Sequence, residues 1–267
     1  MVSTKEKAFS NRYSSSTIVN MSLKVLYEDN HLIAVYKPVG VLVQPVRSKT
    51  SFRMSADMPL ASRTSNGFQP DLPDGDSLMD DVKKYLKDKY KKQGNVFLGL
   101  VHRLDRNVSG VVLFAKTSKG AARLSEQFRN NEIKKIYHAV VEGKISPADG
   151  TLIHYLNKDE NRKIALVSDS PKTGYDRSEL EYETVKSDNE HTLLKINLKT
   201  GRFHQIRAQF SRISHPIVGD GKYGAKSKMS DQSLALCATE VQFKTATTEE
   251  TKVIRVEYPS SWSKFFN

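Results

Sequence analysis

Short apolar runs, separated by polar turn residues, follow one another along the chain from residue 23 onward. The first two runs, residues 25–27 and 32–36, flank a polar segment at residues 28–30, which predicts two strands joined by a turn. Pro38 has no N–H for a strand ladder and Gly40 permits a sharp bend, so the second strand is expected to end there. Further strands are predicted at residues 111–115, 136–141, 182–185, 193–198, 241–243 and 253–258.

Three segments show the spacing of amphipathic helices. Apolar residues between positions 78 and 86 recur on one stripe, and either Asp76 or Ser77 can cap the helix that they predict. Ser118 can cap a second helix, and a third is predicted over residues 203–213. Because the strands arrive in hairpin-like groups and not as regular strand–helix–strand units, the predicted fold class is α+β: a mixed, largely antiparallel β-sheet with flanking helices.

The chain is predicted to consist of a tail and one large domain that carries an insertion. Residues 1–20 are rich in Ser, Lys and Arg and predict a flexible N-terminal tail, so the domain is expected over residues 21–267. Residues 46–75 are polar, with five serines and three prolines and no sustained period, which predicts a mobile surface insertion. The tail lacks the apolar region of a secretory signal, so a cytoplasmic location is expected, with organellar targeting by the tail as the alternative.

Charge and cysteine content narrow the classes of protein. Forty-two Lys and Arg residues against thirty Asp and Glu give a net charge of +12, and such a positive field concentrates a polyanion such as nucleic acid. The single cysteine excludes an intrachain disulfide and a cysteine-based zinc site. No apolar run approaches the roughly 20 residues needed to cross a bilayer, so no membrane partner is expected.

The segment with the clearest chemistry lies at residues 102–110. Asp105 stands in an irregular stretch directly before a predicted buried strand, where a carboxylate can be held rigidly beside a cleft. Arg103 and Arg106 offer charge partners or phosphate contacts, and Gly110 allows a close backbone approach. Taken alone, the segment also fits a purely structural ion pair between Asp105 and an arginine.

Two further segments place functional groups at predicted elements. Residues 200–207 open the third helix, where backbone donors favour an anion. Arg207 can pair there with a buried carboxylate and hold that carboxylate ionised. Tyr137 lies on the strand predicted at residues 136–141, on the same side as Ala139, where its ring can stack on a base or pack in the core.

Five segments, in the same order along the chain, resemble motifs of the RluA-type family of RNA pseudouridine synthases. They are residues 25–40, 102–110, 135–143, 201–207 and 215–224. The resemblance implies that residues 21–267 form a pseudouridine synthase catalytic domain, with no separate N-terminal RNA-binding domain. It also implies an RNA partner, either rRNA or tRNA, whose specific uridines a monomeric enzyme isomerises to pseudouridine.

The resemblance implies a catalytic set of Asp105, Tyr137 and Arg207. Asp105 matches the family's nucleophile, which acts on a flipped-out uridine. Tyr137 would stack on the base and assist removal of the C5 proton, and Arg207 would pair with the carboxylate. The expected substrate- and RNA-binding residues, with the two histidines as hydrogen-bonding supports, are Arg103, Ile206, His102, Arg106, Gly201, Arg202 and His204.

The seven histidines show no metal-ligand spacing, and the implied reaction needs no metal ion, redox step or small-molecule cofactor. Two other functions stay open. A non-catalytic RNA-binding or ribosome assembly factor could have the same fold, and a base-excising glycosylase would also use a carboxylate at a sugar centre. RNA binding without isomerisation would identify the first, and release of free uracil would identify the second.

Overall fold

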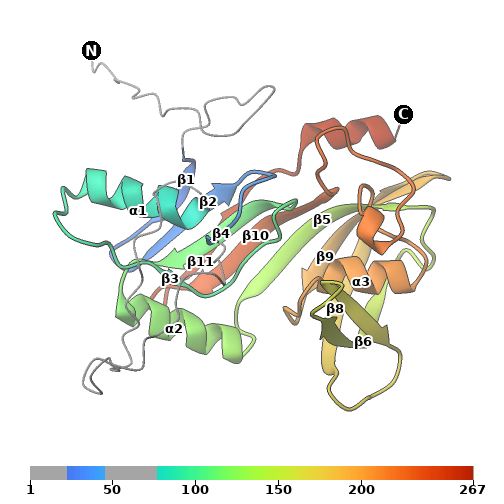
Figure 1. Cartoon of the computed structure of the whole chain (residues 1–267), viewed down its shortest axis with the longest axis horizontal. Helices are drawn as coiled ribbons and strands as arrows, with labels where there is room; N and C mark the ends of the chain where they lie inside the picture. Colours follow the sequence, from blue (N-terminus) through green and yellow to red (C-terminus); the bar gives the residue numbers. More distant parts are fainter. Residues whose placement is uncertain (1–22, 46–76, 267) are drawn as a thin grey trace, which may run out of the picture.

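The computed structural model describes residues 23–45 and 77–266 (Figure 1). The tail predicted at residues 1–20 and the insertion predicted at residues 46–75 lie outside the described residues. The described strands are β1 (Val25–Glu28), β2 (Leu32–Lys37), β3 (Gly99–Leu100), β4 (Ser109–Ala115), β5 (Lys134–Glu142), β6 (Asp149–Asp159), β7 (Ile164–Ser168), β8 (Asp176–Ser187), β9 (His191–Leu198), β10 (Leu236–Lys244) and β11 (Thr251–Arg255).

The eleven strands of the described part form one sheet, in the order β1-β2-β4-β10-β5-β9-β8-β6-β7, with β3 beside β4 and β11 beside β10. Only β4 and β10 pair in parallel among these strands, and the other neighbours are antiparallel. The structure therefore confirms the predicted mixed, largely antiparallel sheet. β10 and β5 run through its middle. β1, β2 and β4 form one wing of the sheet, and β9, β8, β6 and β7 form the other (Figure 1).

The described helices flank these wings. α1 (Leu78–Lys89) and α2 (Ser118–Arg129) lie on the wing of β1, β2 and β4, and α3 (Gln205–Arg212) packs against β6 and β7 (Figure 1). Two short 3-10 helices, η2 (Gly221–Tyr223) and η3 (Ser260–Phe265), follow α3 along the chain. In η3, Trp262 is buried and stacks on Tyr258 with ring centroids 5.6 Å apart, so it anchors the C-terminal segment in the core.

Alternation along β2 explains why α1 and α2 cover opposite faces of the sheet. Ile33 and Val35 belong to the core cluster that includes the buried residues of α1, whereas Leu32 and Ala34 belong to the cluster that includes Leu124 of α2. Successive side chains of a strand point to opposite faces, so a strand buried on both faces reads as one continuous apolar run. The runs predicted from the sequence at β2 and β4 have this origin.

The structure corrects three predicted boundaries. Thr117, not Ser118, caps α2: its backbone is extended and its side chain accepts a hydrogen bond from the N–H of Gly120. α3 begins at Gln205 and not at residue 203, because His204 adopts the left-handed conformation, which interrupts a helix. β11 ends at Arg255 and not at residue 258, because the chain beyond it turns into η3.

Glu28 at the end of β1 ties the wing together. Its carboxylate accepts hydrogen bonds from Tyr85 and Lys89 of α1, from Tyr90, and from Lys116, at 2.6 to 3.0 Å. Burial alone would raise the pKa of Glu28, but these hydrogen bonds, that of Lys116 first, outweigh burial and lower the pKa to about 2. The folded state therefore stabilises the ionised form of the Glu28 carboxylate.

Replacing Glu28 with glutamine tests this network. We expect Glu28→Gln to lower the free energy of unfolding by about 2 kcal/mol at neutral pH, because the buried cation of Lys116 loses its charged partner. The folded pKa of about 2 lies below the reference value of 4.5, so the stabilisation is complete above pH 4.5 and disappears as the pH falls towards 2. Urea unfolding at several pH values measures the difference; a gap between the two proteins that stays constant from pH 7 to pH 2 would contradict the network.

Gly110 permits the parallel contact between β4 and β10. Its φ is +128°, and a Cβ atom at this position would overlap the backbone of Ala238, its partner in the ladder. The close approach predicted from the sequence is therefore confirmed. This contact joins the wing of β4 to the central strand β10, directly after the segment that contains Asp105.

Adding a methyl group at Gly110 tests the contact. We expect Gly110→Ala to lower the free energy of unfolding by about 3 kcal/mol or more, because both the backbone conformation and the space exclude a side chain. The control is Gly94→Ala, where nothing lies within 4 Å of the added atom, and where we expect a change of less than about 0.5 kcal/mol. Equal effects of the two substitutions in urea unfolding would refute the role of the close approach.

Candidate active site

A buried lysine holds the loop that contains Asp105. Lys37 at the end of β2 is fully buried, and its ammonium donates hydrogen bonds to the carbonyl oxygens of Pro38, Arg106 and Val108 at 3.0, 3.0 and 2.6 Å. Burial lowers the pKa of Lys37 to about 7, and the charge of Asp105 opposes this shift. Two of the three carbonyls, those of Arg106 and Val108, follow closely after Asp105 in sequence, so Lys37 fixes the backbone of the loop from which the carboxylate projects.

Arg106 braces the same loop. Its Nε donates to the carbonyl oxygen of Gly40 at 2.9 Å, and the N–H of Gly40 donates to the carbonyl oxygen of Arg106, also at 2.9 Å. Gly40 has a φ of +84°, as expected for the sharp bend after β2. Arg106 is otherwise exposed, so its contact with RNA stays a prediction beside this structural contribution.

Arg207 joins the Asp105 loop to α3. Its Nη1 donates to Oδ2 of Asp105 at 2.8 Å, so the ion pair expected from the sequence is present. Its Nε and Nη2 donate to the two carboxylate oxygens of Asp220 at 2.6 and 2.9 Å. Burial alone would lower the pKa of Arg207, but Asp220 and then Asp105 raise it, so the guanidinium is charged. The side chain of Asp105 is 27% exposed, whereas that of Asp220 is 1% exposed.

His204 lies beside Asp105 as a neutral ring. Its Nε2 is 3.5 Å from Oδ2 of Asp105, and its Nδ1 is 2.9 Å from the hydroxyl of Tyr223. Burial lowers the pKa of His204 to about 4, against the opposing charge of Asp105. The Tyr223 hydroxyl accepts the N–H of Ala165 at 2.6 Å, which leaves its own proton to donate to Nδ1. The remaining ring proton is then on Nε2, which faces Asp105.

Tyr137 and Ile206 line the apolar side of this site. Tyr137 on β5 is 8% exposed and Ile206 in α3 is 5% exposed, and both belong to the main core cluster. Burial first, and then the charge of Asp105, raise the pKa of Tyr137, so its phenol keeps its proton at neutral pH. The effect of the Asp105 charge indicates that the two side chains lie near one another, and the functional roles of both residues stay predictions.

The other predicted site residues differ in their contacts and in their exposure. His102 is a structural support: its Nε2 accepts the N–H of Leu113 at 2.9 Å and its ring stacks on Phe128. Arg103 is exposed and makes no hydrogen bond or ion pair within the described residues. Gly201 and Arg202 are exposed in the turn before α3. RNA contacts by these four residues stay predictions.

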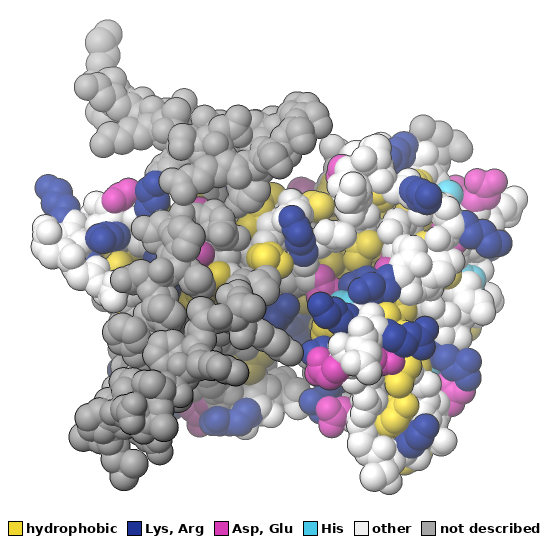
Figure 2. Space-filling model, viewed as in Figure 1, with side chains coloured by type: hydrophobic (Ala, Val, Ile, Leu, Met, Phe, Trp, Pro, Cys, Tyr) yellow, Lys and Arg dark blue, Asp and Glu magenta, His cyan; other side chains and the backbone are white. Residues whose placement is uncertain are grey.

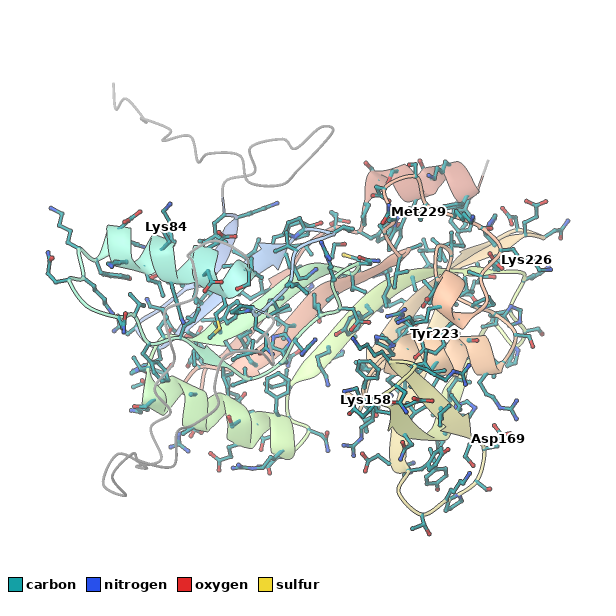
Figure 3. All side chains as sticks on the ribbon, viewed as in Figure 1. Lys84, Lys158, Asp169, Tyr223, Lys226 and Met229 are labelled. Atoms are coloured by element: carbon teal, nitrogen blue, oxygen red, sulfur yellow. The ribbon has the colours of Figure 1, made fainter. Side chains whose placement is uncertain are left out.

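Three contributors to the site were missed in the sequence: Lys37, Asp220 and Tyr223. Each lies in a segment that matched a family motif, but the local pattern did not show which distant group it would contact. Asp220 and Tyr223 contact Arg207 through the turn that follows α3, and the Tyr223 ring lies 5.0 Å from the guanidinium carbon. Figure 3 shows Tyr223 at this turn, in the same wing as Lys158 of β6.

Basic side chains surround the entrance to the site. Phe203 stacks on His204 with ring centroids 3.8 Å apart, and Nζ of Lys158 lies 5.1 Å from the Phe203 ring centroid. The charges of Arg103 and Lys222 lower the pKa of His204 further, which places them nearby. We call Arg103, Lys158 and Lys222 the basic rim. In Figure 2, Lys and Arg side chains gather over this wing of the molecule.

The described residues include neither a membrane-spanning helix nor a cluster of metal ligands. No helix in this part of the chain is long and apolar enough to cross a membrane. No group of three or more His, Cys, Asp or Glu side chains among the described residues is arranged to hold a metal ion.

The chain is similar to known proteins over most of its length. The chain is 31% identical over 261 residues to the tRNA pseudouridine synthase C of Vibrio cholerae, which covers 90% of this chain and 93% of that protein. It is 28% identical to a rice protein named RNA pseudouridine synthase 2, chloroplastic, covering 79% of this chain but only 51% of the rice protein. The structure of human RNA pseudouridylate synthase domain containing 4 shares the fold, with a TM-score of 0.66, 19% identity and 90% coverage of both chains.

The family model described as RNA pseudouridylate synthase matches residues 31–212. This range includes β2, the Asp105 loop, β5 with Tyr137, and α3 with Arg207. The resemblance drawn from five sequence segments is therefore confirmed, and the chain belongs to the RNA pseudouridylate synthase family, whose members are isomerases.

Proposed function

We propose that this protein converts uridine to pseudouridine in RNA and that the carboxylate of Asp105 is the nucleophile. The observation that carries the proposal is the setting of Asp105. Its side chain is partly exposed, it lies on a loop fixed by Lys37, and a single hydrogen bond from Arg207 holds it. Its neighbours His204 and Tyr137 are neutral at pH 7. A fixed, ionised oxygen beside neutral walls is suited to attack on a substrate that enters from the open side.

The reaction breaks the N1–C1′ bond, turns the uracil while it stays bound, and forms a C5–C1′ bond. The last step moves one proton from C5 to N1. Tyr137 is placed beside the site and keeps its own proton, so its hydroxyl can accept one proton while it donates the other. Ile206 and the Tyr137 ring exclude water from the cleaved intermediate, which protects it from hydrolysis.

The target uridine must leave its stack to reach Asp105, because the side chain of Asp105 is only 27% exposed. The basic rim gives the flanking phosphates cationic partners, and Phe203 offers a ring for a neighbouring base. Both tRNA and rRNA fit this chemistry. The name of the Vibrio relative makes tRNA the first substrate class to test.

Asp105→Asn tests the proposed nucleophile. We expect isomerisation of a tRNA pool to fall by about 1,000-fold or more, because the amide is a poor nucleophile, while RNA affinity changes by less than about threefold. Carbodiimide mapping at single-nucleotide resolution measures the product. The control is Asp88→Asn on the exposed face of α1, which should retain wild-type turnover.

Each other result of this experiment points to a different function. Turnover by Asp105→Asn would remove Asp105 from the central role. A wild-type protein that binds RNA but isomerises uridine in neither tRNA nor rRNA would support the alternative function of a non-catalytic RNA-binding or ribosome assembly factor. Free uracil released from RNA would identify a glycosylase.

Lys158→Gln tests the basic rim. If Lys158 contacts one phosphate, the slope of log Kd against log salt concentration should fall in magnitude by about 0.7 to 0.9, and affinity should weaken similarly for different RNA sequences. Fluorescence anisotropy across a salt series measures this slope. Lys119→Gln, on the exposed side of α2 in the other wing, is the matched control and should leave the slope unchanged. An unchanged slope for Lys158→Gln would exclude its phosphate contact.

A further inference from the structure

Arg207 lies between two carboxylates that differ in burial and in the number of bonds they accept. Asp220 is 1% exposed and takes two of the guanidinium nitrogens, Nε at 2.6 Å and Nη2 at 2.9 Å. Asp105 is 27% exposed and takes only Nη1, at 2.8 Å. The stronger, two-point contact is therefore made with the group that does not face the open side of the site.

The turn that carries Asp220 is fixed to the central sheet. The N–H of Val218 donates to the carbonyl oxygen of Val140 on β5 at 2.9 Å, and Ile217 forms a bridge with Val141 of the same strand. Gly219 has a φ of +88°, and a Cβ atom there would meet the carbonyl oxygen of Ser233 at 2.5 Å, so the turn has one tight path. Asp220 is thereby held relative to β5, the strand that carries Tyr137.

Tyr223 limits the guanidinium from a second direction. Its ring centroid lies 5.0 Å from Cζ of Arg207, within the range of a cation–π contact. The ring is itself held by its hydroxyl, which contacts Ala165 and His204. With Asp220 at two nitrogens and Tyr223 beside the carbon, Arg207 directs its third nitrogen, Nη1, towards Asp105.

We propose that Asp220 is a positioning residue for the isomerisation, acting through Arg207 on the nucleophile Asp105. By occupying Nε and Nη2, Asp220 aims Nη1 at Asp105 and prevents Arg207 from making the two-point contact with the nucleophile that an unrestrained guanidinium prefers. It also offsets part of the arginine's charge, so Asp105 keeps an oxygen free for attack. This inference rests on the proposed function and assigns a residue to it.

Asp220→Asn removes this restraint with little change in shape. The side-chain amide would face one N–H of Arg207 with its own N–H groups, so the two-point contact is lost. We expect kcat to fall about 100-fold, the cost of a misplaced reacting group, while KM and RNA Kd change by less than about threefold. Glu142→Gln is the matched control, because its carboxylate accepts from Lys226 and Ser227 in the segment after Asp220 and does not touch Arg207; it should keep wild-type kcat.

A double-mutant cycle separates positioning from general stabilisation. If Asp220 acts through Arg207, Asp220→Asn should lower kcat by less than about threefold further in an Arg207→Gln background. Losses that multiply in the double variant, or a loss of kcat matched by a loss of folded protein in thermal unfolding, would overturn the inference. Single-turnover rates with excess enzyme make the slow variants measurable.

A second variant covers the case in which Asp220→Asn does not fold. Arg207→Lys keeps the positive charge, but its single ammonium nitrogen cannot replace the three guanidinium nitrogens that bind the two carboxylates. The restraint on the cation is therefore lost although Asp220 is intact. We expect about 100-fold loss of kcat with RNA affinity unchanged, and a wild-type kcat would overturn the inference. If the wild-type protein lacks isomerase activity, the proposed function and this inference both fall, whereas equal activity of wild type and Asp220→Asn removes this inference alone.

Discussion

The guanidinium of Arg207 joins parts of the chain that are far apart in sequence. One of its carboxylate partners, Asp105, precedes β4, and the other, Asp220, follows α3. Burying an arginine is costly unless its charge is paired and hydrogen-bonded, and here two carboxylates accept three hydrogen bonds from it while the Tyr223 ring lies beside the guanidinium carbon. The position of the Arg207 guanidinium therefore depends on both carboxylates.

The sheet brings these partners together. Asp105 belongs to the wing of β1, β2 and β4, and Arg207 belongs to the wing of α3, β6 and β7. Between them, β4 pairs in parallel with β10, and β10 pairs with β5, which carries Tyr137. The contact at Gly110 therefore fixes the distance between the two wings. The hydrogen bonds of Lys37 fix the position of the Asp105 loop relative to them. The backbone contacts in the wing of β4 thus determine the distance that the Arg207 guanidinium spans from the other wing to Asp105.

Elements with strong local signals could be predicted from the sequence, and contacts over long distances could not. β2 and β4 are buried on both faces and read as unbroken apolar runs. β6 and β7 were missed because few of their side chains are buried, only His154 and Leu156 on β6 and Ala165 on β7, so burial leaves little pattern in their sequences. The pairing of Arg207 with Asp220 was missed for another reason, since it depends on a turn through Gly219 whose path is set by contact with Ser233.

The protonation states around Asp105 follow from burial more than from individual partners. Burial is the largest cause of the lowered pKa of His204 and of the raised pKa of Tyr137, and each shift makes the group neutral at pH 7. The same burial would also disfavour the charge of Arg207, but Asp220 supplies the opposite charge that offsets this cost. Without that second carboxylate, Arg207 would depend on Asp105 alone for its charge balance and would bind Asp105 more strongly. A partly exposed carboxylate that shares a buried arginine with a second, buried carboxylate is bound less tightly than one that neutralises the arginine alone, and Asp220 is that second carboxylate.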